Sequence, residues 1–514
     1  MRKTEFIAVL DFGSQYNQLI ARRIREFNIY CEVLPHTTTA KELKNRGAKG
    51  IILSGGPASV FDKKAPTCDK EILTSGIPVL GICYGMQLGC KLFNCAVKPS
   101  SLREYGRTKL NIIDETDLFY GIPENSIVWM SHGDSVKRFT KEFTILAETE
   151  DCPNAAVRHN SHKFWGVQFH PEVTHTEQGM KILRNFLKKI CLCRGNWKIR
   201  DYVEQTIKNI RLEVGKNRVI CGLSGGVDSS VAAVMMHKAI GDQLTCIFVD
   251  NGLLRQNEKE QVSQTFRNYY KINLKIANSG KNFLKLLKGV THPEKKRKII
   301  GHEFIEVFKK EAKKVKGAKY LVQGTLYPDV IESSSAFGGP TSVIKTHHNV
   351  GGLPKKLGFK LIEPLKFLFK DEVRRIAKEL NMPPEIYMRH PFPGPGLAVR
   401  ILGEITKERL HLLRKCDYIF IEEIKNANLY DKIWQAFAVL LPVKTVGVMG
   451  DARTYESVIA LRAVNSHDGM TADWHRMPHS VLETISNRIV SEVRGVNRVV
   501  YDISTKPPST IEWE

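Results

Sequence analysis

The segment Ser224-Gly225-Gly226-Val227-Asp228-Ser229-Ser230 constrains the fold of this chain more than any other. It follows the apolar run Val219–Leu223 and precedes a helix-like stretch from Ser230 to Ala239. A strand, a Gly/Ser-rich turn and a helix direct backbone N–H groups and the positive end of the helix toward an anion. The hydroxyls and glycines permit close approach to phosphate oxygens, and Asp228 is a candidate ligand for a divalent cation bound there. The pattern predicts a parallel α/β sheet that binds a phosphorylated ligand.

No Gly-Lys-Ser or Gly-Lys-Thr tripeptide occurs in the chain, which excludes a Walker-type phosphate loop. The alternative to a functional loop is a simple Gly/Ser turn before a helix. The segment resembles the PP-loop of ATP pyrophosphatases, which cleave ATP to AMP and pyrophosphate while they activate an oxygen as an adenylate. The resemblance implies that ATP and Mg²⁺ are cofactors and that Asp228 holds the metal ion. The loop residues 224–230 would bind ATP together with Asp250 and Gly324.

The composition is that of a soluble, multi-domain protein. The 514 residues are too many for one hydrophobic core and predict about three or four domains. No apolar run reaches membrane-spanning length, so we expect no membrane contact. The eleven cysteines include no Cys-x-x-Cys pair, which indicates reduced thiols in a cytoplasmic protein in preference to a disulfide framework or a zinc site.

The formal net charge of +23 permits nucleic-acid binding but equally suits anionic nucleotide substrates. Much of the charge lies in the lysine-rich stretches Lys285–Lys298 and Lys309–Lys316. We interpret these stretches mainly as solvated helix faces and expect no nucleic-acid partner.

The pattern of expected strands and helices changes twice along the chain, which predicts three domains. Short apolar strands alternate with helical patterns in residues 1–193 and 198–389, which predicts two mainly parallel α/β domains. The segment His390–Gly396 is rich in proline and glycine and predicts a linker or a rigid loop. Residues 390–514 then mix helix and strand, as in an α+β domain. The expected strands are Phe6–Leu10, Gly50–Ser54, Pro78–Ile82, Phe164–Phe169, Val219–Leu223, Thr245–Val249, Tyr320–Gln323, Val443–Met449 and Val496–Tyr501, and the expected helices include Gln15–Phe27, Gly179–Ile190 and Lys407–Asn426.

The first domain carries a second candidate site. Cys83 lies between Gly81 and Gly85 after an apolar strand and before a helix, the layout of a nucleophile elbow, where a helix N-terminus favours the thiolate. His170 and Glu172 follow the strand Phe164–Phe169, and their spacing allows the carboxylate to orient the imidazole. Each element alone is also compatible with a structural cysteine or a chance surface loop. Their combination at the carboxyl ends of strands in one domain predicts a cysteine-dependent catalytic site.

The motifs that carry Cys83, His170 and Glu172 resemble those of the class I glutamine amidotransferases. The resemblance implies that Cys83 attacks the amide of glutamine, that His170 moves the proton and that Glu172 holds His170. Backbone N–H groups of Gly56 and Tyr84 would form an oxyanion hole. The residues that match glutamine-binding positions of the family are Gln87, Ser131, His132, Gly133 and Asp134.

A glutaminase domain makes ammonia, and a PP-loop domain makes an adenylate that ammonia can displace. The downstream motifs, among them residues 249–255, 293–301, 323–329, 344–352, 389–400 and the tail 506–514, resemble those of the GMP synthetase family in order and nearly end to end. The resemblance implies glutamine, ATP and xanthosine monophosphate (XMP) as substrates and GMP as product. It also implies a homodimer formed through the C-terminal domain, which would complete the XMP site.

Two further groups of residues follow from this resemblance. Lys345, His347 and His348 lie in a Gly-flanked segment and would form a lid with donors for a phosphoryl transition state; a solvated basic loop is the alternative. The residues that match nucleotide-binding positions are Arg297, Gln435, Lys506, Ile511 and Glu512. Ile511 and Trp513 give the charged tail apolar anchors, which predicts that it docks on the protein.

Three other interpretations remain open from the residues. Another PP-loop amidotransferase, such as a glutamine-dependent NAD synthetase, uses a Glu-Lys-Cys triad in place of Cys83, His170 and Glu172. An RNA-modifying PP-loop enzyme suits the charge, but sulfur-transferring members commonly carry the Cys-x-x-Cys pairs that this chain lacks. A binding protein without catalysis conflicts with the complete triad and the intact loop.

Overall fold

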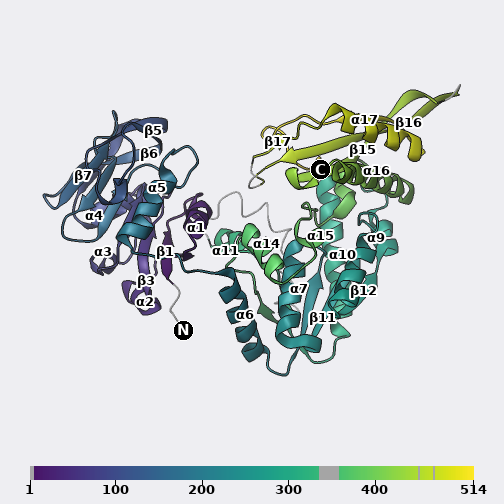
Figure 1. Ribbon diagram of the computed structural model, residues 1–514, viewed down its shortest axis with the longest axis horizontal. Coiled ribbons are helices and arrows are strands. Elements are labelled where there is room, and N and C mark those ends of the chain that lie inside the picture. The colour runs from purple at the N-terminus through teal and green to yellow at the C-terminus, as the bar shows by residue number, and fades with distance from the viewer. Residues whose placement is uncertain (1–4, 335–357, 450–451, 467–468, 470) are drawn as a thin grey trace. The chain divides into compact units, whose positions relative to one another are not determined.

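The computed structural model describes residues 5–334, 358–449, 452–466, 469 and 471–514. The chain forms two compact units, of which the first comprises Met1–Asp201 with Tyr327–Ser342 and the second comprises Tyr202–Leu326 with Val343–Glu514 (Figure 1). The second unit contains both of the predicted domains that follow residue 198. The three domain boundaries therefore stay predictions.

The first unit is built on a nine-stranded sheet in the order β2-β1-β3-β4-β9-β8-β7-β5-β6. Neighbouring strands from β2 to β9 are parallel, as predicted, whereas β8, β7, β5 and β6 pair antiparallel. The prediction of a mainly parallel sheet did not include these antiparallel strands, because their apolar alternation is short or interrupted. The strands are β1 (Phe6–Asp11), β2 (Tyr30–Pro35), β3 (Ala48–Leu53), β4 (Val79–Ile82), β5 (Ala96–Ile112), β6 (Ser126–Arg138), β7 (Phe143–Glu148), β8 (Ala156–His159) and β9 (Phe164–Val167).

The helices of the first unit include α4 (Tyr84–Leu92), which follows β4 directly and is buried along most of its length. The sheet and this helix share a core of apolar side chains that includes Leu10, Leu53 and Phe164. The other helices are α1 (Asn17–Glu26), α2 (Ala40–Arg46), α3 (Glu71–Thr74), the 3-10 helix η1 (Asp117–Phe119), α5 (Gly179–Arg184), the π-helical η2 (Asn185–Ile190) and α11 (Tyr327–Ser334).

The second unit contains a five-stranded parallel sheet in the order β12-β11-β10-β13-β14 and a smaller sheet of β15, β16, β17 and β18. The predicted helix at Lys407–Asn426 and the predicted strand at Val496–Tyr501 are confirmed at the same residues. The strands are β10 (Arg218–Leu223), β11 (Leu244–Asp250), β12 (Asn273–Asn278), β13 (Ala318–Val322), β14 (Lys360–Ile362), β15 (Gln435–Met449), β16 (Ala452–Asn465), β17 (Asp473–Trp474) and β18 (Val496–Tyr501). The main helices are α6 (Ile199–Val214), α7 (Val227–Ile240), α8 (Glu258–Ser263), α9 (Gly280–Leu287), α10 (Pro293–Lys313), α14 (Lys370–Glu379), α15 (Pro384–Tyr387), α16 (Lys407–Asn426) and α17 (His479–Glu492).

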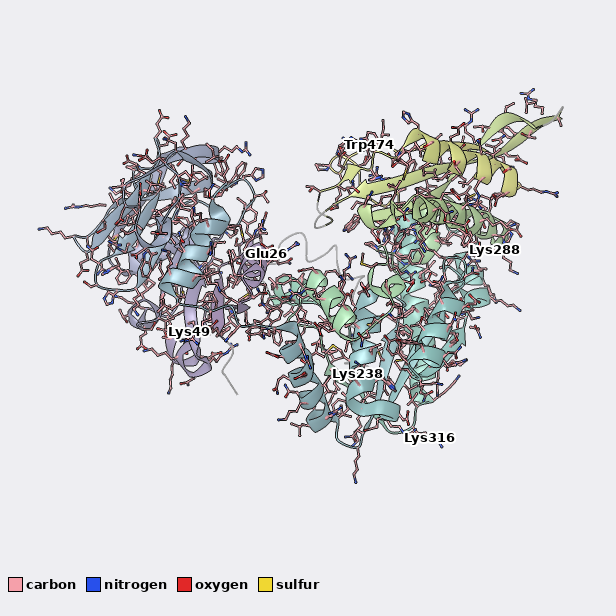
Figure 2. All side chains as sticks on the ribbon, in the orientation of Figure 1. Glu26, Lys49, Lys238, Lys288, Lys316 and Trp474 are labelled. Carbon is pink, nitrogen blue, oxygen red and sulfur yellow. The ribbon has the colours of Figure 1, made fainter. Side chains whose placement is uncertain are left out.

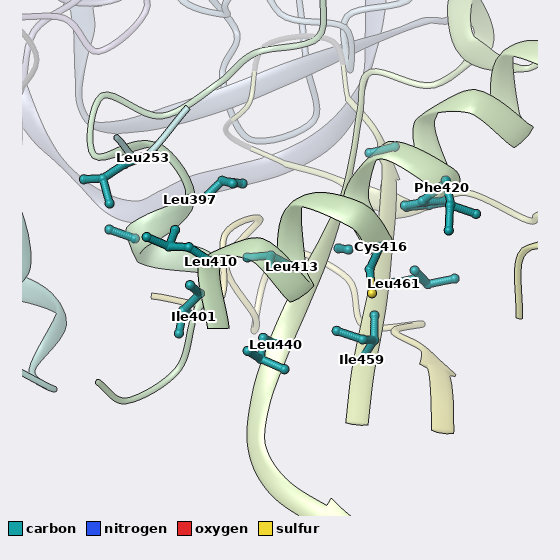
Figure 3. Close-up of a cluster of buried hydrophobic side chains, with 14 of the residues drawn as sticks. Leu253, Leu397, Ile401, Leu410, Leu413, Cys416, Phe420, Leu440, Ile459 and Leu461 are labelled. Atoms are coloured by element: carbon teal, nitrogen blue, oxygen red, sulfur yellow. The ribbon is translucent and has the colours of Figure 1, made fainter. Parts of the chain in front are cut away.

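One hydrophobic core extends across both sheets of the second unit. Leu253, which follows β11, and Leu397 belong to the same buried cluster as Leu413 of α16 and Ile459 of β16 (Figure 3). The Leu397 amide also donates to the Leu253 carbonyl over 2.8 Å. The segment that begins at His390 is therefore a docked loop and not a free linker.

The basic residues lie mainly on the surface of both units, as predicted for the lysine-rich stretches. Lys49, Lys238, Lys288 and Lys316 are exposed (Figure 2). Lys296 does not lie on a solvated helix face as predicted for its stretch. Its ammonium is buried and donates to the Ile401 carbonyl over 2.6 Å. Among the described helices, none has the length and apolar character needed to cross a membrane.

Candidate active sites

The sheet of the first unit brings the candidate glutaminase residues together. Strand β4 lies between β3 and β9, and all three are parallel, with Leu53 opposite Gly81 and Ile82 opposite Val167. The carboxyl ends of parallel neighbours meet at one edge of a sheet. The segments that follow these strands, which carry Gly55, Cys83 and His170, therefore converge there.

Cys83 occupies a strained turn between β4 and α4. Its φ of 49° and ψ of −105° lie where few residues other than glycine are found. A Cβ atom at Gly81 would lie 2.6 Å from the Met86 amide nitrogen, and Gly85 packs equally closely on the backbone of Leu53. The glycines on both sides of Cys83 are thus required by the tight packing of a nucleophile elbow.

His170 and Glu172 complete a triad with Cys83. His170 Nδ1 lies 2.8 Å from Glu172 Oε1, and the Cys83 thiol is near enough to influence the charge of the imidazole. Burial disfavours the charged imidazolium, but the Glu172 carboxylate and the Cys83 thiol outweigh it and hold the pKa of His170 well above its ordinary value. The Glu172 side chain is fully buried, so its charge acts on His170 with little screening by water.

Two further side chains, which no sequence motif indicates, lie around the thiol. Gln168 donates from Nε2 to Cys83 Sγ over 3.6 Å, and its Oε1 accepts from Gln87 Nε2 over 3.2 Å. The ring of Tyr16 packs edge-on against the His170 ring at 5.1 Å between centroids. No motif marks either residue, since both owe their place to strands that meet only in the folded sheet.

The predicted glutamine-binding residues form one hydrogen-bonded group beside Cys83. Gln87 Nε2 donates to the Asp134 carbonyl over 2.7 Å, and the Asp134 carboxylate accepts from Ser59 Oγ over 2.5 Å. The Cys83 thiol approaches the Ser131 carbonyl at 3.6 Å. His132 and Gly133 lie in the same stretch of β6, but both ring nitrogens of His132 face protein atoms, the Asp134 carbonyl at 3.0 Å and Glu104 Oε2 at 3.2 Å.

Backbone groups near Cys83 suit an oxyanion. Tyr84 is the first residue of α4, so its N–H has no acceptor within the helix. The adjoining segment after β3 is close as well, since a Cβ atom at Gly55 would lie 3.2 Å from His170 Cε1 and 3.9 Å from Cys83 Cβ. Gly56 follows Gly55 and packs against the Phe12 carbonyl, where a Cβ atom would lie only 2.5 Å away.

The Gly/Ser-rich loop of the second unit joins β10 to α7 as predicted, although the helix begins at Val227 and not at Ser230. Gly226 precedes the helix in an extended conformation, and its carbonyl accepts from the Ser230 amide. Ser224 Oγ contacts Ser229 Oγ at 2.9 Å, which closes the turn. Asp228 consequently lies in the first turn of α7, at the positive end of the helix dipole.

Lys370, Arg389 and Glu258, none of which was predicted to bind ATP, lie beside this loop. Lys370 pairs with Asp228 Oδ2 at 2.5 Å. Arg389 donates to the Gly225 carbonyl over 3.1 Å and pairs with Glu258 at 2.6 Å. Asp228 Oδ1 is buried and has no hydrogen-bond partner among the described residues, so an oxygen of the type that Mg²⁺ prefers is available.

The remaining predicted ATP-binding residues fall on adjacent elements. Gly324 follows β13, and a Cβ atom there would lie 3.2 Å from the Asp228 carbonyl carbon. Asp250 ends β11, accepts from the Gly252 amide over 3.0 Å and pairs with Lys259 at 3.2 Å. Gly324 thus contacts the phosphate loop, while Asp250 lies on the neighbouring strand. The predicted lid residues Lys345, His347 and His348 lie outside the described residues.

Comparison with known proteins assigns all three parts of the chain. Residues 8–190 match the family model "Glutamine amidotransferase class-I", residues 198–295 match "NAD synthase" and residues 422–513 match "GMP synthase C terminal domain". A glutamine-hydrolysing GMP synthase of Caldanaerobacter subterraneus is 57% identical over 512 residues and covers all of this chain and 99% of its own. The corresponding proteins of Aquifex aeolicus and Clostridium tetani are 56% and 55% identical, with at least 99% of each chain covered.

The chain belongs to the glutamine-hydrolysing GMP synthase family. This membership confirms the resemblance found in the sequence. It also decides against the other PP-loop interpretations, since an NAD synthetase or an RNA-modifying enzyme would not match these GMP synthases from end to end.

The C-terminal tail carries three of the residues that match nucleotide-binding positions of the GMP synthase family, and it docks as predicted. Glu512 accepts from the fully buried Arg400 over 2.8 and 3.1 Å and from Gln435 over 2.8 Å. Ile511 is buried in an apolar cluster with Phe437. Trp513 is the exception, since it is 38% exposed and donates to Asp502 in place of packing as an anchor.

Arg297 and Lys506, the two basic residues that match nucleotide-binding positions, contact described residues other than Glu512. Arg297 of α10 donates to the Glu514 carbonyl, and Lys506 Nζ donates to the Gly469 carbonyl over 2.8 Å. Lys506 also borders a cavity of about 650 Å³ that His390 and Trp434 help to line. This volume suits a nucleotide-sized ligand.

Proposed function

We propose that the two sites perform the two half-reactions of glutamine-dependent GMP synthesis. In the first, the Cys83 thiolate attacks the side-chain amide carbon of glutamine, and the N–H groups of Gly56 and Tyr84 stabilise the oxyanion. The His170 imidazolium protonates the departing nitrogen, which leaves as ammonia. Water activated by His170 then hydrolyses the γ-glutamyl thioester to glutamate, with Glu172 holding the imidazole.

In the second half-reaction, ATP adenylates the C2 oxygen of XMP and releases pyrophosphate; ammonia then displaces AMP and leaves GMP. The phosphate loop 224–230 holds the ATP phosphates at the start of α7. Mg²⁺, when bound, neutralises charge on these phosphates, and Asp228 is the residue that would hold it. The lid residues Lys345, His347 and His348 would add donors for the transition state.

The XMP site combines residues of the predicted C-terminal domain with Arg297 of α10. Gln435 and Glu512 offer an amide and a carboxylate for a purine, while Arg297 and Lys506 offer cations for a 5′-phosphate.

We also propose a homodimer through the C-terminal domain, because apolar side chains on β15 and β16, such as Val446, Val448 and Tyr455, are exposed. A cytoplasmic location agrees with the eleven free, buried cysteines.

The observation that carries the proposal is the joint presence of the buried Cys83–His170–Glu172 triad and the phosphate loop in one chain. The decisive assay supplies glutamine, ATP, Mg²⁺ and XMP and separates the nucleotides. We expect GMP, AMP and pyrophosphate in equal amounts. ADP and phosphate as products would contradict the proposal.

Cys83→Ala separates the two half-reactions. The variant has no nucleophile for glutamine but leaves the phosphate loop unchanged. Synthesis from glutamine should be abolished, while synthesis from ammonium chloride should remain within about twofold of the wild type. Failure of ammonia to restore GMP formation would show that Cys83 does not act only in the glutaminase reaction.

A further inference from the structure

Three buried side chains in the first unit place a carboxylate, an imidazole and a thiol together. Glu104 lies on β5, His132 on β6, and Cys152 in the turn between β7 and β8. One oxygen, nitrogen or sulfur atom of each lies within 4.8 Å of the other two. None of the three is more than 6% exposed.

The hydrogen bonds of His132 leave its Nε2 facing a second acceptor. A carbonyl oxygen only accepts, so the Asp134 carbonyl at 3.0 Å requires the proton of His132 on Nδ1. Nε2 then faces Glu104 Oε2 at 3.2 Å. An ionised carboxylate only accepts hydrogen bonds, so Glu104 Oε2 is an acceptor as well. Two facing acceptors require a cation between them, either a proton or a metal ion.

The other hydrogen bonds orient the remaining donor atoms. Thr149 Oγ1 donates to Glu104 Oε1 over 3.0 Å, which leaves Oε2 directed at His132. The Cys152 amide donates to Thr149 Oγ1 over 3.0 Å, and the Thr149 amide donates to the Cys152 carbonyl over 2.9 Å. Metal-ligating imidazoles and carboxylates commonly have their second polar atom held in this way.

The spacing suits a small tetrahedral ion. Zinc bonds of about 2.0–2.1 Å to nitrogen, 2.0–2.2 Å to oxygen and 2.3 Å to sulfur place tetrahedral ligand atoms about 3.4–3.6 Å apart. The Nε2–Oε2 distance of 3.2 Å is close to this value. The Cys152 sulfur lies within 4.8 Å of one ring nitrogen of His132 and one carboxylate oxygen of Glu104, so side-chain rotation of about an ångström brings it to the tetrahedral spacing.

We propose that Glu104 Oε2, His132 Nε2 and Cys152 Sγ form a Zn²⁺ site with a fourth position for water. Binding would release the thiol proton of Cys152 and any proton held between Nε2 and Oε2, with no change of oxidation state. A set of nitrogen, oxygen and sulfur ligands favours zinc over Mg²⁺ or Ca²⁺, which take oxygen ligands.

This inference does not depend on the proposed function, because it concerns metal binding by the first unit alone. The site nevertheless adjoins the glutaminase residues. The Asp134 carbonyl that accepts from His132 also accepts from Gln87 Nε2 over 2.7 Å. A metal ion on Nε2 would fix the His132 ring and thereby the position of this carbonyl.

The test measures metal binding by the full chain in a Cys83→Ala background, since Cys83 and His170 offer a second thiol–imidazole pair. The chelator-treated protein is titrated with Zn²⁺ against a chromophoric chelator and, separately, with Co²⁺. We expect one Zn²⁺ per chain. With Co²⁺ we expect a near-ultraviolet thiolate-to-cobalt charge-transfer band with the visible bands of a tetrahedral ion.

Two matched variants locate the site. Cys152→Ala should remove the charge-transfer band, whereas Cys68→Ala, which removes another buried thiol of the same unit, should retain it. Thr149→Val keeps all three ligands but frees Glu104, and it should weaken Zn²⁺ binding by about 10–100-fold. Circular dichroism and the rise of Tm on adding Zn²⁺ show whether each variant folds and binds.

Several results would overturn the proposal. They are the absence of stoichiometric Zn²⁺ in the Cys83→Ala protein, equal binding with and without Cys152, and equal loss of binding in the Cys152 and Cys68 variants. If Cys152→Ala fails to fold, Thr149→Val decides, and unchanged affinity in that variant would show that a buried His132–Glu104 ion pair is all that the cluster provides.

Discussion

The substitution Glu172→Gln tests the electrostatic part of the glutaminase site with almost no change in shape. Glu172 Oε1 lies 2.8 Å from His170 Nδ1, and at an effective dielectric constant of about 20 the attraction between unit charges at this distance is about 6 kcal/mol. This is a ceiling, since the imidazolium charge is spread over the ring. Proton transfer by a positioned side chain typically contributes about 10²–10⁴-fold, or about 3–5 kcal/mol, which lies below the ceiling.

We therefore expect Glu172→Gln to lower kcat for glutamine-dependent GMP formation by about 10²–10⁴-fold and to leave the ammonia-dependent rate within about twofold. The pKa of His170 is raised by Glu172, so the charged imidazolium persists to higher pH in the wild type. Loss of the carboxylate should move the alkaline limb of the glutaminase pH profile to lower pH.

Glutamate release and GMP formation are measured in parallel, with glutamine or ammonium chloride as the nitrogen source. Glu177→Gln is the control, because Glu177 is exposed and lies five residues further along the same segment. A glutamine-dependent rate within about threefold of the wild type, or an equal loss of the ammonia-dependent rate, would refute the role given to Glu172.

Three further perturbations address other parts of the chain. Asp228→Ala should abolish GMP formation from both nitrogen sources, measured as AMP and pyrophosphate release, because the candidate ligand of Mg²⁺ is lost; retained synthesis would contradict it. Gly81→Ala places a Cβ atom 2.6 Å from the Met86 amide nitrogen and should cost about 1–3 kcal/mol in urea unfolding, along with the glutaminase activity; an unchanged midpoint would be inconsistent with this packing. Burial lowers the pKa of His390 to about 4, against about 6.5 in an unfolded chain, so about 3 kcal/mol of stability should be lost as the pH falls from about 6.5 to about 4. His390→Gln should flatten that part of the stability profile, and an unaltered slope would show that His390 is not its source.

The positions of Cys83, His170 and the loop 224–230 at the ends of strands were predictable because each is tied to a local pattern, while their catalytic and binding roles stay proposals. Cys83 and the loop 224–230 directly follow apolar strands, His170 lies three residues after one, and parallel strands deliver the residues after them to one edge of the sheet. The chain therefore specified the sites before any long-range contact was known. The lid residues lie outside the described structure and stay a prediction, as do the domain boundaries.

The partners of these residues were not predictable, because they join positions far apart in the chain. Gln168 meets Cys83 across 85 residues, Lys370 meets Asp228 across 142, and Arg400 meets Glu512 across 112. Gln168 and Lys370 lie in unremarkable local sequence, and the motif 389–400 does not indicate which partner Arg400 would contact. Nothing in the spacing distinguishes them from solvated side chains.

Residue types and their order along the chain were enough to indicate phosphate binding and amide hydrolysis, since hydroxyls, glycines, a cysteine and a histidine follow predicted strands. The tertiary structure decided how that chemistry is supported. It added the antiparallel half of the first sheet, turned Arg400 inward to hold the tail, and brought Glu104, His132 and Cys152 together from three separate segments. Local sequence patterns indicate which residues lie at the end of a strand or at the start of a helix. Distant charged and polar groups pair because they become buried together, and only the folded chain defines which groups are buried.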